Sequence, residues 1–149
     1  MILPEIPPPE ARSDSRLALI ADSFYRLTGK PLVESADLLW NAPKVIVAHG
    51  TEVDPVFFYG NKLALQLFEM SFAEFTRLPS RLSAETMEQG ARAALLERVT
   101  RAGFVDDYSG VRISKNGARF VIKQATVWNL LDEAGVYRGQ AATFDEPLA

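Results

Sequence analysis

Alternating apolar and polar residues mark the stretch from Phe104 to Trp128, which Asn116-Gly117 interrupts. An Asn-Gly pair between two β-rich runs predicts a hairpin with a two-residue type I′ turn, because that turn needs positive φ at both central residues. With Lys115 opposite Ala118, the remaining pairs follow by counting outward. One face of the predicted hairpin then carries two facing rows: Val105, Asp107, Ser109, Val111 and Ile113 opposite Trp128, Thr126, Gln124, Ile122 and Phe120.

This first face is apolar at both ends and polar in its middle. Burying an unpaired hydroxyl or amide costs roughly 1–3 kcal/mol, so Ser109 and Gln124 must bond each other, a water or a ligand. Small-molecule sites are apolar cavities with a few placed polar groups. We therefore predict a ligand cavity between this face and the helices. Its predicted polar residues are Ser109, Gln124, Thr126 and Asp107, and its predicted aromatic wall is Phe58, Phe68 and Trp128.

Two alternatives stay open for this site. Ser109 and Gln124 could satisfy each other inside an ordinary core, in which the aromatic side chains are simply core residues. A β-bulge could also shift the register and exchange the two faces, with Asp107 bridging to a loop instead of facing the cavity.

Helical periodicity predicts a first helix from Ser13 to Leu27, whose apolar stripe is Leu17, Ile20, Ala21, Phe24 and Leu27. Gly29 ends it. Further helices are expected at Ser35–Trp40, Asn61–Glu69, Ser71–Thr76 and Ser83–Ala102. Asn61 is expected to serve only as a helix cap. The longest helix has a predicted buried stripe of Met87, Ala91, Ala94, Leu95 and Val99.

Short apolar runs predict the remaining strands, at Lys44–Ala48, Val56–Tyr59 and Tyr137–Phe144. The order of elements indicates an α+β domain, with a five-stranded antiparallel sheet and helices on one face. The expected division is a proline-rich leader at 1–12, an N-terminal helical extension at 13–42 and the domain itself at 43–149.

The second face of the hairpin carries an apolar strip: Phe104, Tyr108, Val121, Ala125 and Val127. Such a strip is too apolar to face water comfortably. We expect the N-terminal helix to cover it within one chain, or two chains to share that helix in a homodimer.

Composition narrows the class of protein. The 149 residues are 48% apolar and 23% charged, which is typical of one globular domain. A net charge of -3 without a basic run makes nucleic acid and anionic membranes poor partners. No apolar run approaches the roughly 20 residues that span a bilayer, and Met1 to Glu10 has no basic region typical of a signal peptide. We expect a cytoplasmic protein.

The chain has no cysteine, which excludes disulfides, thiolate metal sites, cysteine nucleophiles and a cysteinyl–flavin adduct. His49 is the only histidine, so any imidazole base or haem ligand must be this residue. Its position before Gly50, at a strand end, favours an ordinary backbone hydrogen bond. No set of His, Asp and Glu has metal-ligand spacing, so we expect no metal.

Several short runs carry a resemblance to known families. Asn61-Lys62-Leu63-Ala64, Phe68-Glu69-Met70-Ser71 and Lys115-Asn116-Gly117 resemble signatures of PAS domains. Longer runs resemble the MEKHLA family, a PAS-like domain: Val47-Ala48-His49-Gly50-Thr51, Leu78-Pro79-Ser80-Arg81-Leu82-Ser83-Ala84-Glu85, Asp106-Asp107-Tyr108-Ser109-Gly110-Val111-Arg112 and Ala125-Thr126-Val127-Trp128-Asn129-Leu130.

The resemblance covers nearly the whole chain from Leu17 onward and implies a PAS-like fold, a free-standing sensory or binding role and a tendency to dimerise. PAS haem sensors carry their ligand on the long helix, and Ser83–Ala102 has no histidine, so haem is not expected. The expected function is a non-catalytic sensory or regulatory domain that binds a small molecule or mediates association, signalling through the N-terminal helix. The alternatives are a small α+β enzyme with Asp107 or His49 as general base, and an assembly protein whose cavity is filled core.

Overall fold

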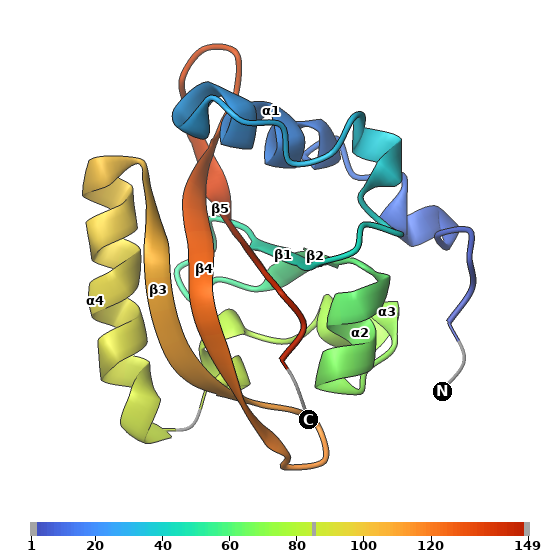
Figure 1. The fold of residues 1–149 in the computed structure, drawn as a ribbon, viewed down its shortest axis with the longest axis vertical. Coiled ribbons are helices and arrows are strands. Elements are labelled where there is room, and N and C mark those ends of the chain that lie inside the picture. The colour runs from blue at the N-terminus through green and yellow to red at the C-terminus, as the bar shows by residue number, and fades with distance from the viewer. Residues whose placement is uncertain (1–2, 85, 148–149) are drawn as a thin grey trace.

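The computed structural model describes residues 3–84 and 86–147 (Figure 1). At its centre lies a five-stranded antiparallel sheet in the order β2-β1-β5-β4-β3. The strands are β1 (Val45–His49), β2 (Phe57–Gly60), β3 (Phe104–Ile113), β4 (Arg119–Leu131) and β5 (Tyr137–Phe144). The predicted α+β architecture is confirmed.

Helices precede β1 and fill the segment between β2 and β3, and the longer ones lie close to the predicted positions. They are η1 (Pro9–Ala11), α1 (Leu17–Thr28), η2 (Ala36–Leu38), α2 (Lys62–Phe68), α3 (Phe72–Phe75), η3 (Ser80–Ser83) and α4 (Thr86–Ala102), where η denotes a 3-10 helix. On α4, Leu95 and Val99 are buried as predicted, whereas Ala91 and Ala94 are exposed. Met87 lies outside the residues whose side chains are described.

Both faces of the sheet are covered. On the inner face, Leu95 and Val99 of α4 pack against Val127 of β4, and α2 and α3 lie against β1 and β2. On the outer face, α1 lies against β4. Figure 1 shows α4 alongside β3, and α1 across the end of the sheet where β4 leads into β5. Because both faces are covered, all of β1 is buried.

The turn of the β3–β4 hairpin is one residue longer than predicted. Ser114 N donates to Ala118 O at 2.9 Å, which leaves a three-residue loop of Lys115, Asn116 and Gly117. Only Gly117 of these residues has positive φ, at 83°, whereas a type I′ turn needs it at two positions. The pairs near the turn therefore shift by one, and Arg112 lies opposite Phe120.

A bulge in β4 then moves the residues of β4 beyond it to the opposite face, and an extra residue in β3 between Val105 and Tyr108 restores the pairing further on. Gly110 pairs with Ile122 but Tyr108 pairs with Ala125, so β4 carries one extra residue between these pairs. Gln124 absorbs it with a φ of 50°. Ala125 and Val127 consequently lie on the inner face and Trp128 on the outer face, the reverse of the prediction.

The exchange also changes what the N-terminal helix covers. α1 was predicted to cover Tyr108, Ala125 and Val127, but it packs on Trp128 instead. Trp128 Nε1 donates to Ile20 O at 3.1 Å, and the Phe24 ring meets the Trp128 ring edge-on with centroids 4.9 Å apart. The helix is part of the folded unit, on the opposite face of the hairpin from the one predicted.

Asn61 does more than cap α2. Its Oδ1 accepts from Ala64 N and from Ile46 N, both at 3.1 Å. Its Nδ2 donates to the carbonyls of Leu39 and Lys44, at 3.1 and 2.8 Å. This fully buried side chain therefore joins α2, β1 and the segment after η2.

The hairpin tip is held by α2 and α3. Ser114 Oγ donates to Glu69 Oε1 at 2.8 Å, and Lys115 forms an ion pair with Glu74. The Lys115 ammonium lowers the pKa of the Glu74 carboxyl to about 2. These contacts hold the end of β3 that carries Arg112 against the helices.

The packing of α1 predicts a large loss of stability for Phe24→Ala. The ring is 8% exposed, so its removal is expected to lower the free energy of unfolding by about 3–5 kcal/mol. Tyr25→Ala is the matched control, since that ring is 59% exposed and its loss should cost less than about 0.5 kcal/mol. Chemical denaturation measures both variants. Equal losses would show that α1 does not pack on the sheet in solution.

Candidate functional site

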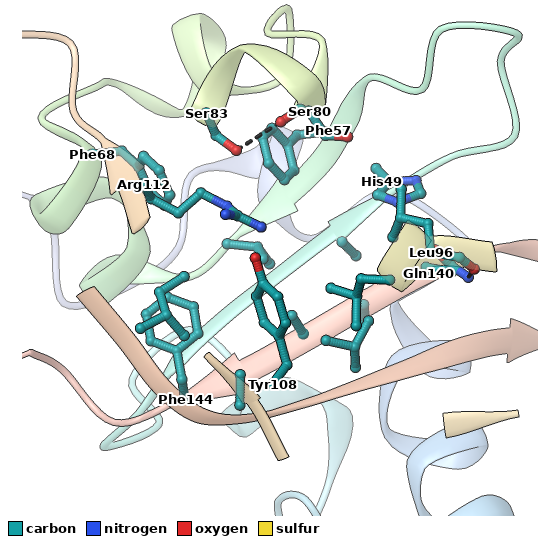
Figure 2. Close-up of a pocket in the computed structure, with 18 residues that line it drawn as sticks. His49, Phe57, Phe68, Ser80, Ser83, Leu96, Tyr108, Arg112, Gln140 and Phe144 are labelled. Carbon is teal, nitrogen blue, oxygen red and sulfur yellow. Dashed lines mark hydrogen bonds between the residues drawn. The ribbon is translucent and has the colours of Figure 1, made fainter. Parts of the chain in front are cut away.

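A cavity of about 70 Å³ lies between the inner face of the sheet and the segments α2, η3 and α4. Figure 2 shows its lining residues, most of which are apolar. The apolar lining residues come from the sheet and from helices α2 and α4: Val47, Ala48, Phe57, Phe68, Leu95, Leu96, Ile122, Ala125, Val127, Ala141, Ala142 and Phe144. The polar part is smaller: His49, Ser80, Ser83, Tyr108, Arg112 and Gln140.

Arg112 is the charged side chain among the described lining residues, and it is 7% exposed. The three-residue turn places it on the inner face of β3, where the predicted register had placed Val111 and Ile113. Its Nη1 donates to Val111 O at 3.0 Å, and its guanidinium carbon lies 5.3 Å from the centroid of the Tyr108 ring. Among the described residues, no carboxylate oxygen lies within 4.0 Å of its nitrogens.

Gly110 makes room for the Tyr108 side chain. A Cβ at Gly110 would lie 2.2 Å from the Tyr108 hydroxyl oxygen and 3.3 Å from Arg112 Nη1. Such a Cβ would overlap the tyrosine, so the ring can lie along β3 only because position 110 is glycine. The hydroxyl of Tyr108 and the guanidinium of Arg112 therefore meet over the same glycine, inside the cavity (Figure 2).

The opposite end of the cavity is closed by an amide network. Gln140 Nε2 donates to Asn129 Oδ1 at 3.0 Å and to Leu96 O at 3.3 Å. Asn129 Nδ2 donates to Val99 O at 3.1 Å. These two buried amides from β5 and β4 tie the backbone of α4 to the sheet and fix the width of the cavity there.

Three further polar residues, all buried, complete the described lining: His49, Ser80 and Ser83. His49 Nδ1 lies 3.0 Å from Gly50 O, in agreement with the predicted backbone contact at the strand end. Ser83 Oγ donates to Ser80 O at 2.7 Å, which closes the η3 turn above Arg112 (Figure 2).

Of the predicted site residues, Phe68 lines the cavity. Ser109, Gln124 and Asp107 are exposed, and Asp107 forms an ion pair with Arg98 at 3.0 Å. The prediction that they face the cavity is wrong, because the longer turn and the bulge exchange the faces. Asp107 bridges to helix α4 through Arg98, not to a loop.

The other predicted residues also lie away from the cavity lining. Thr126 is half-buried, and Trp128 is buried beneath α1 rather than beneath the inner helices. Phe58 is buried with the guanidinium carbon of Arg16 3.9 Å from its ring centroid. The aromatic wall of the cavity is instead made by Phe57, Phe68 and Phe144.

Sequence reasoning missed Tyr108, Arg112 and Gln140. One signal was present: Gly110 interrupts a strand pattern between Tyr108 and Arg112. A glycine inside a strand indicates a bulge or the close approach of another group. Here the close group is the tyrosine two positions before it.

Solved structures with a similar arrangement include PAS domains and light-oxygen-voltage domains. A PAS domain from Colwellia psychrerythraea has a TM-score of 0.62 at 14% identity, over 75% of this chain and 93% of that one. The photo-excited fungal blue-light photoreceptor Vivid has a TM-score of 0.59 at 19% identity, over 87% and 92%. A light-oxygen-voltage domain described with a flavin analogue has a TM-score of 0.59 at 16% identity, over 76% and 84%. The fold is therefore that of the PAS class.

The family model of the MEKHLA domain matches residues 14–147, and the chain belongs to the MEKHLA domain family. This PAS-like family supports a sensory and generally non-catalytic role. Curated proteins yield no match to the chain. Within the described residues, no helix has the length and apolar character needed to cross a bilayer. The same residues bring no three His, Asp or Glu side chains together as a metal site would require.

The contact between Gly110 and Tyr108 predicts a coupled pair of mutations. Gly110→Ala is expected to lower the free energy of unfolding by about 1–3 kcal/mol, because the new methyl group displaces the tyrosine. In a Tyr108→Ala background the same change should cost much less, which a double-mutant cycle measures.

Gly90→Ala is the control, because a Cβ there meets nothing within 4 Å, and alanine in a helix should stabilise by about 0.5–1 kcal/mol. Additive costs for Gly110→Ala and Tyr108→Ala would contradict the placement of the ring over Gly110.

Proposed function

We propose that the chain is a non-catalytic sensory domain whose inner cavity binds a small molecule, and that occupation of the cavity alters the packing of α1. The observation that carries the proposal is the cavity itself. It is mostly apolar, and its charged group and a tyrosine hydroxyl converge over Gly110. This is the composition typical of small-molecule sites.

The route from cavity to α1 runs through β4. Ala125 and Val127 contact the cavity on one face of this strand, while Trp128 contacts α1 on the other. The strand end is also fixed to the helix, since Ser23 Oγ accepts from Leu131 N at 2.9 Å and donates to Leu131 O at 3.2 Å. A ligand that favours one position of β4 therefore also favours one position of α1.

The output of such a shift is a change in association through the N-terminal region. α1 is held to the sheet by Ile20, Ser23 and Phe24, while Tyr25 points outward and is 59% exposed. A second copy of the chain is the proposed partner on this surface. Movement of α1 would then change the stability of the homodimer.

A flavin does not fit this cavity as the side chains lie. The volume of about 70 Å³ is far below the roughly 300–1,000 Å³ of drug-sized sites, and the chain has no cysteine to form an adduct. The similarity to light-oxygen-voltage domains therefore extends to the fold, and we propose a ligand much smaller than a flavin.

An enzyme is not favoured by the geometry. Asp107, one candidate base, is exposed and paired with Arg98, outside the cavity that His49 lines. The two residues thus offer no shared site for acid–base chemistry. The sensory role explains the polar groups of the cavity without a reaction.

Filling the cavity tests the proposal. Native mass spectrometry of the freshly purified chain is expected to show a bound small mass that is lost in Ala142→Val, because two added carbon atoms occupy part of the lining. Ala142 is half-buried on the cavity wall. Ala118→Val adds the same atoms at an exposed hairpin position and should keep the bound mass.

Hydrogen exchange supplies the second readout. Backbone amides of α1 should exchange more slowly in the ligand-bound wild type than in Ala142→Val. The proposal is contradicted by equal occupancy in wild type and Ala142→Val, or by exchange in α1 that does not change when the bound mass is lost.

A further inference from the structure

The guanidinium of Arg112 is buried in the cavity without an anion among the described residues. Its side chain is 7% exposed, and its contacts are the Val111 carbonyl and the Tyr108 ring. Arginine is rarely buried unless it is paired, because removing an uncompensated charge from water is expensive. A carbonyl and an aromatic face compensate the charge only in part, so the position favours an added anion.

Tyr108 provides a second donor at the same place. Its hydroxyl oxygen and Arg112 Nη1 both lie over Gly110, and Figure 2 shows both groups pointing into the cavity. The hydroxyl makes no hydrogen bond to any described residue. A guanidinium and a hydroxyl that converge in this way match the two oxygens of one carboxylate.

The rest of the lining limits what the anion can be attached to. None of the described lining residues is acidic, so no described part of the wall repels a negative group. The surfaces beside Arg112 and Tyr108 are mostly apolar, with Phe57, Phe68 and Ile122 among them, while Ser80 and Ser83 lie above Arg112. Such walls favour an apolar body and disfavour a strongly hydrated dianion such as phosphate. The volume of about 70 Å³ restricts that body to a few carbon atoms.

We infer that the cavity selects short-chain organic monocarboxylates, with the carboxylate held by Arg112 and Tyr108. The inference rests on the proposed function and names its ligand class. Arg112 is then a specificity-determining residue whose burial serves binding at a cost to the stability of the empty protein. An arginine retained only for packing would instead stabilise the empty protein through its aliphatic stem.

The test measures thermal unfolding of the full chain with butanoate, its neutral isostere butyramide, or phosphate, at constant ionic strength. Butanoate is expected to raise the melting temperature of the wild type progressively with concentration, and the other two probes are not. Arg112→Met should weaken butanoate binding by roughly tenfold or more. Arg112→Lys keeps the positive charge but lacks the planar guanidinium that can donate two hydrogen bonds to one carboxylate, so it should give an intermediate affinity. Arg77→Met, at an exposed position, should respond like the wild type.

The empty variants provide an independent readout. Removing a buried charge that is only partly compensated should leave the melting temperature of Arg112→Met equal to or above that of the wild type. A lower melting temperature with an undiminished butanoate response would make Arg112 a packing residue and overturn the inference. Tyr108→Phe, which removes only the hydroxyl, should weaken butanoate binding and leave the melting temperature of the empty protein nearly unchanged.

The remaining outcomes separate the inference from the proposed function. Equal binding of butanoate and butyramide, insensitive to Arg112→Met, would refute anion selection and leave the cavity as a ligand site. Phosphate binding as strong as that of butanoate would refute selection of an apolar body. If neither butanoate nor butyramide binds, the inference fails, and xenon shifts of cavity methyl signals in NMR spectra then decide whether the cavity is accessible at all.

Discussion

The register of the β3–β4 hairpin determines which side chains of these two strands line the cavity. A three-residue turn ending at Gly117 places Arg112 on the inner face. The extra residue at Gln124 then places Ala125 and Val127 on that face and turns Trp128 outward toward α1. Because side chains alternate along a strand, a one-residue shift moves the side chains beyond it to the other face until a second shift compensates it, as happens in β3 between Val105 and Tyr108. The cavity, its charge and the helix contact all depend on these two backbone features.

The same hairpin joins the proposed ligand site to the proposed output helix. Gly110 lets the Tyr108 ring lie along β3, where it meets Arg112 at the cavity. Across the strand pair, β4 presents cavity residues on one side and a tryptophan bonded to α1 on the other. Packed interiors transmit small displacements because they contain few voids. A group bound at Arg112 would contact β3, which pairs with β4, and β4 in turn contacts the N-terminal helix.

Much of the fold could be predicted from the sequence because its signals are local. The apolar stripe of Ile20 and Phe24, the cap at Asn61 and the Asn-Gly turn each locate an element without reference to the rest of the chain. The five antiparallel strands and the family follow from the order of these elements and from the longer runs that resemble MEKHLA domains.

The site could not be predicted in the same way. Its residues are identified by pairing β3 with β4 outward from the turn, so they depend on the number of residues in the loop. Asn116-Gly117 is compatible with a two-residue and a three-residue loop, and only φ at Asn116 separates them. Gln124 gives no sign in the sequence of its positive φ, since a glutamine in a strand is ordinarily extended. Asn61 was underestimated for a related reason: its bonds to Leu39 and Lys44 join segments whose proximity only the fold establishes.

The most direct test of this account is the accessibility of neighbouring positions on the β3–β4 hairpin. The chain has no cysteine, so single substitutions can be labelled with a thiol reagent without background. Gln124→Cys and Ser109→Cys should react in the native protein within about tenfold of their rates in denaturant, while Ala125→Cys should react at least roughly 100-fold more slowly, because its reaction requires opening of the sheet. Rapid labelling of Ala125→Cys together with protection of Gln124→Cys and Ser109→Cys would contradict the bulge and the cavity built on it.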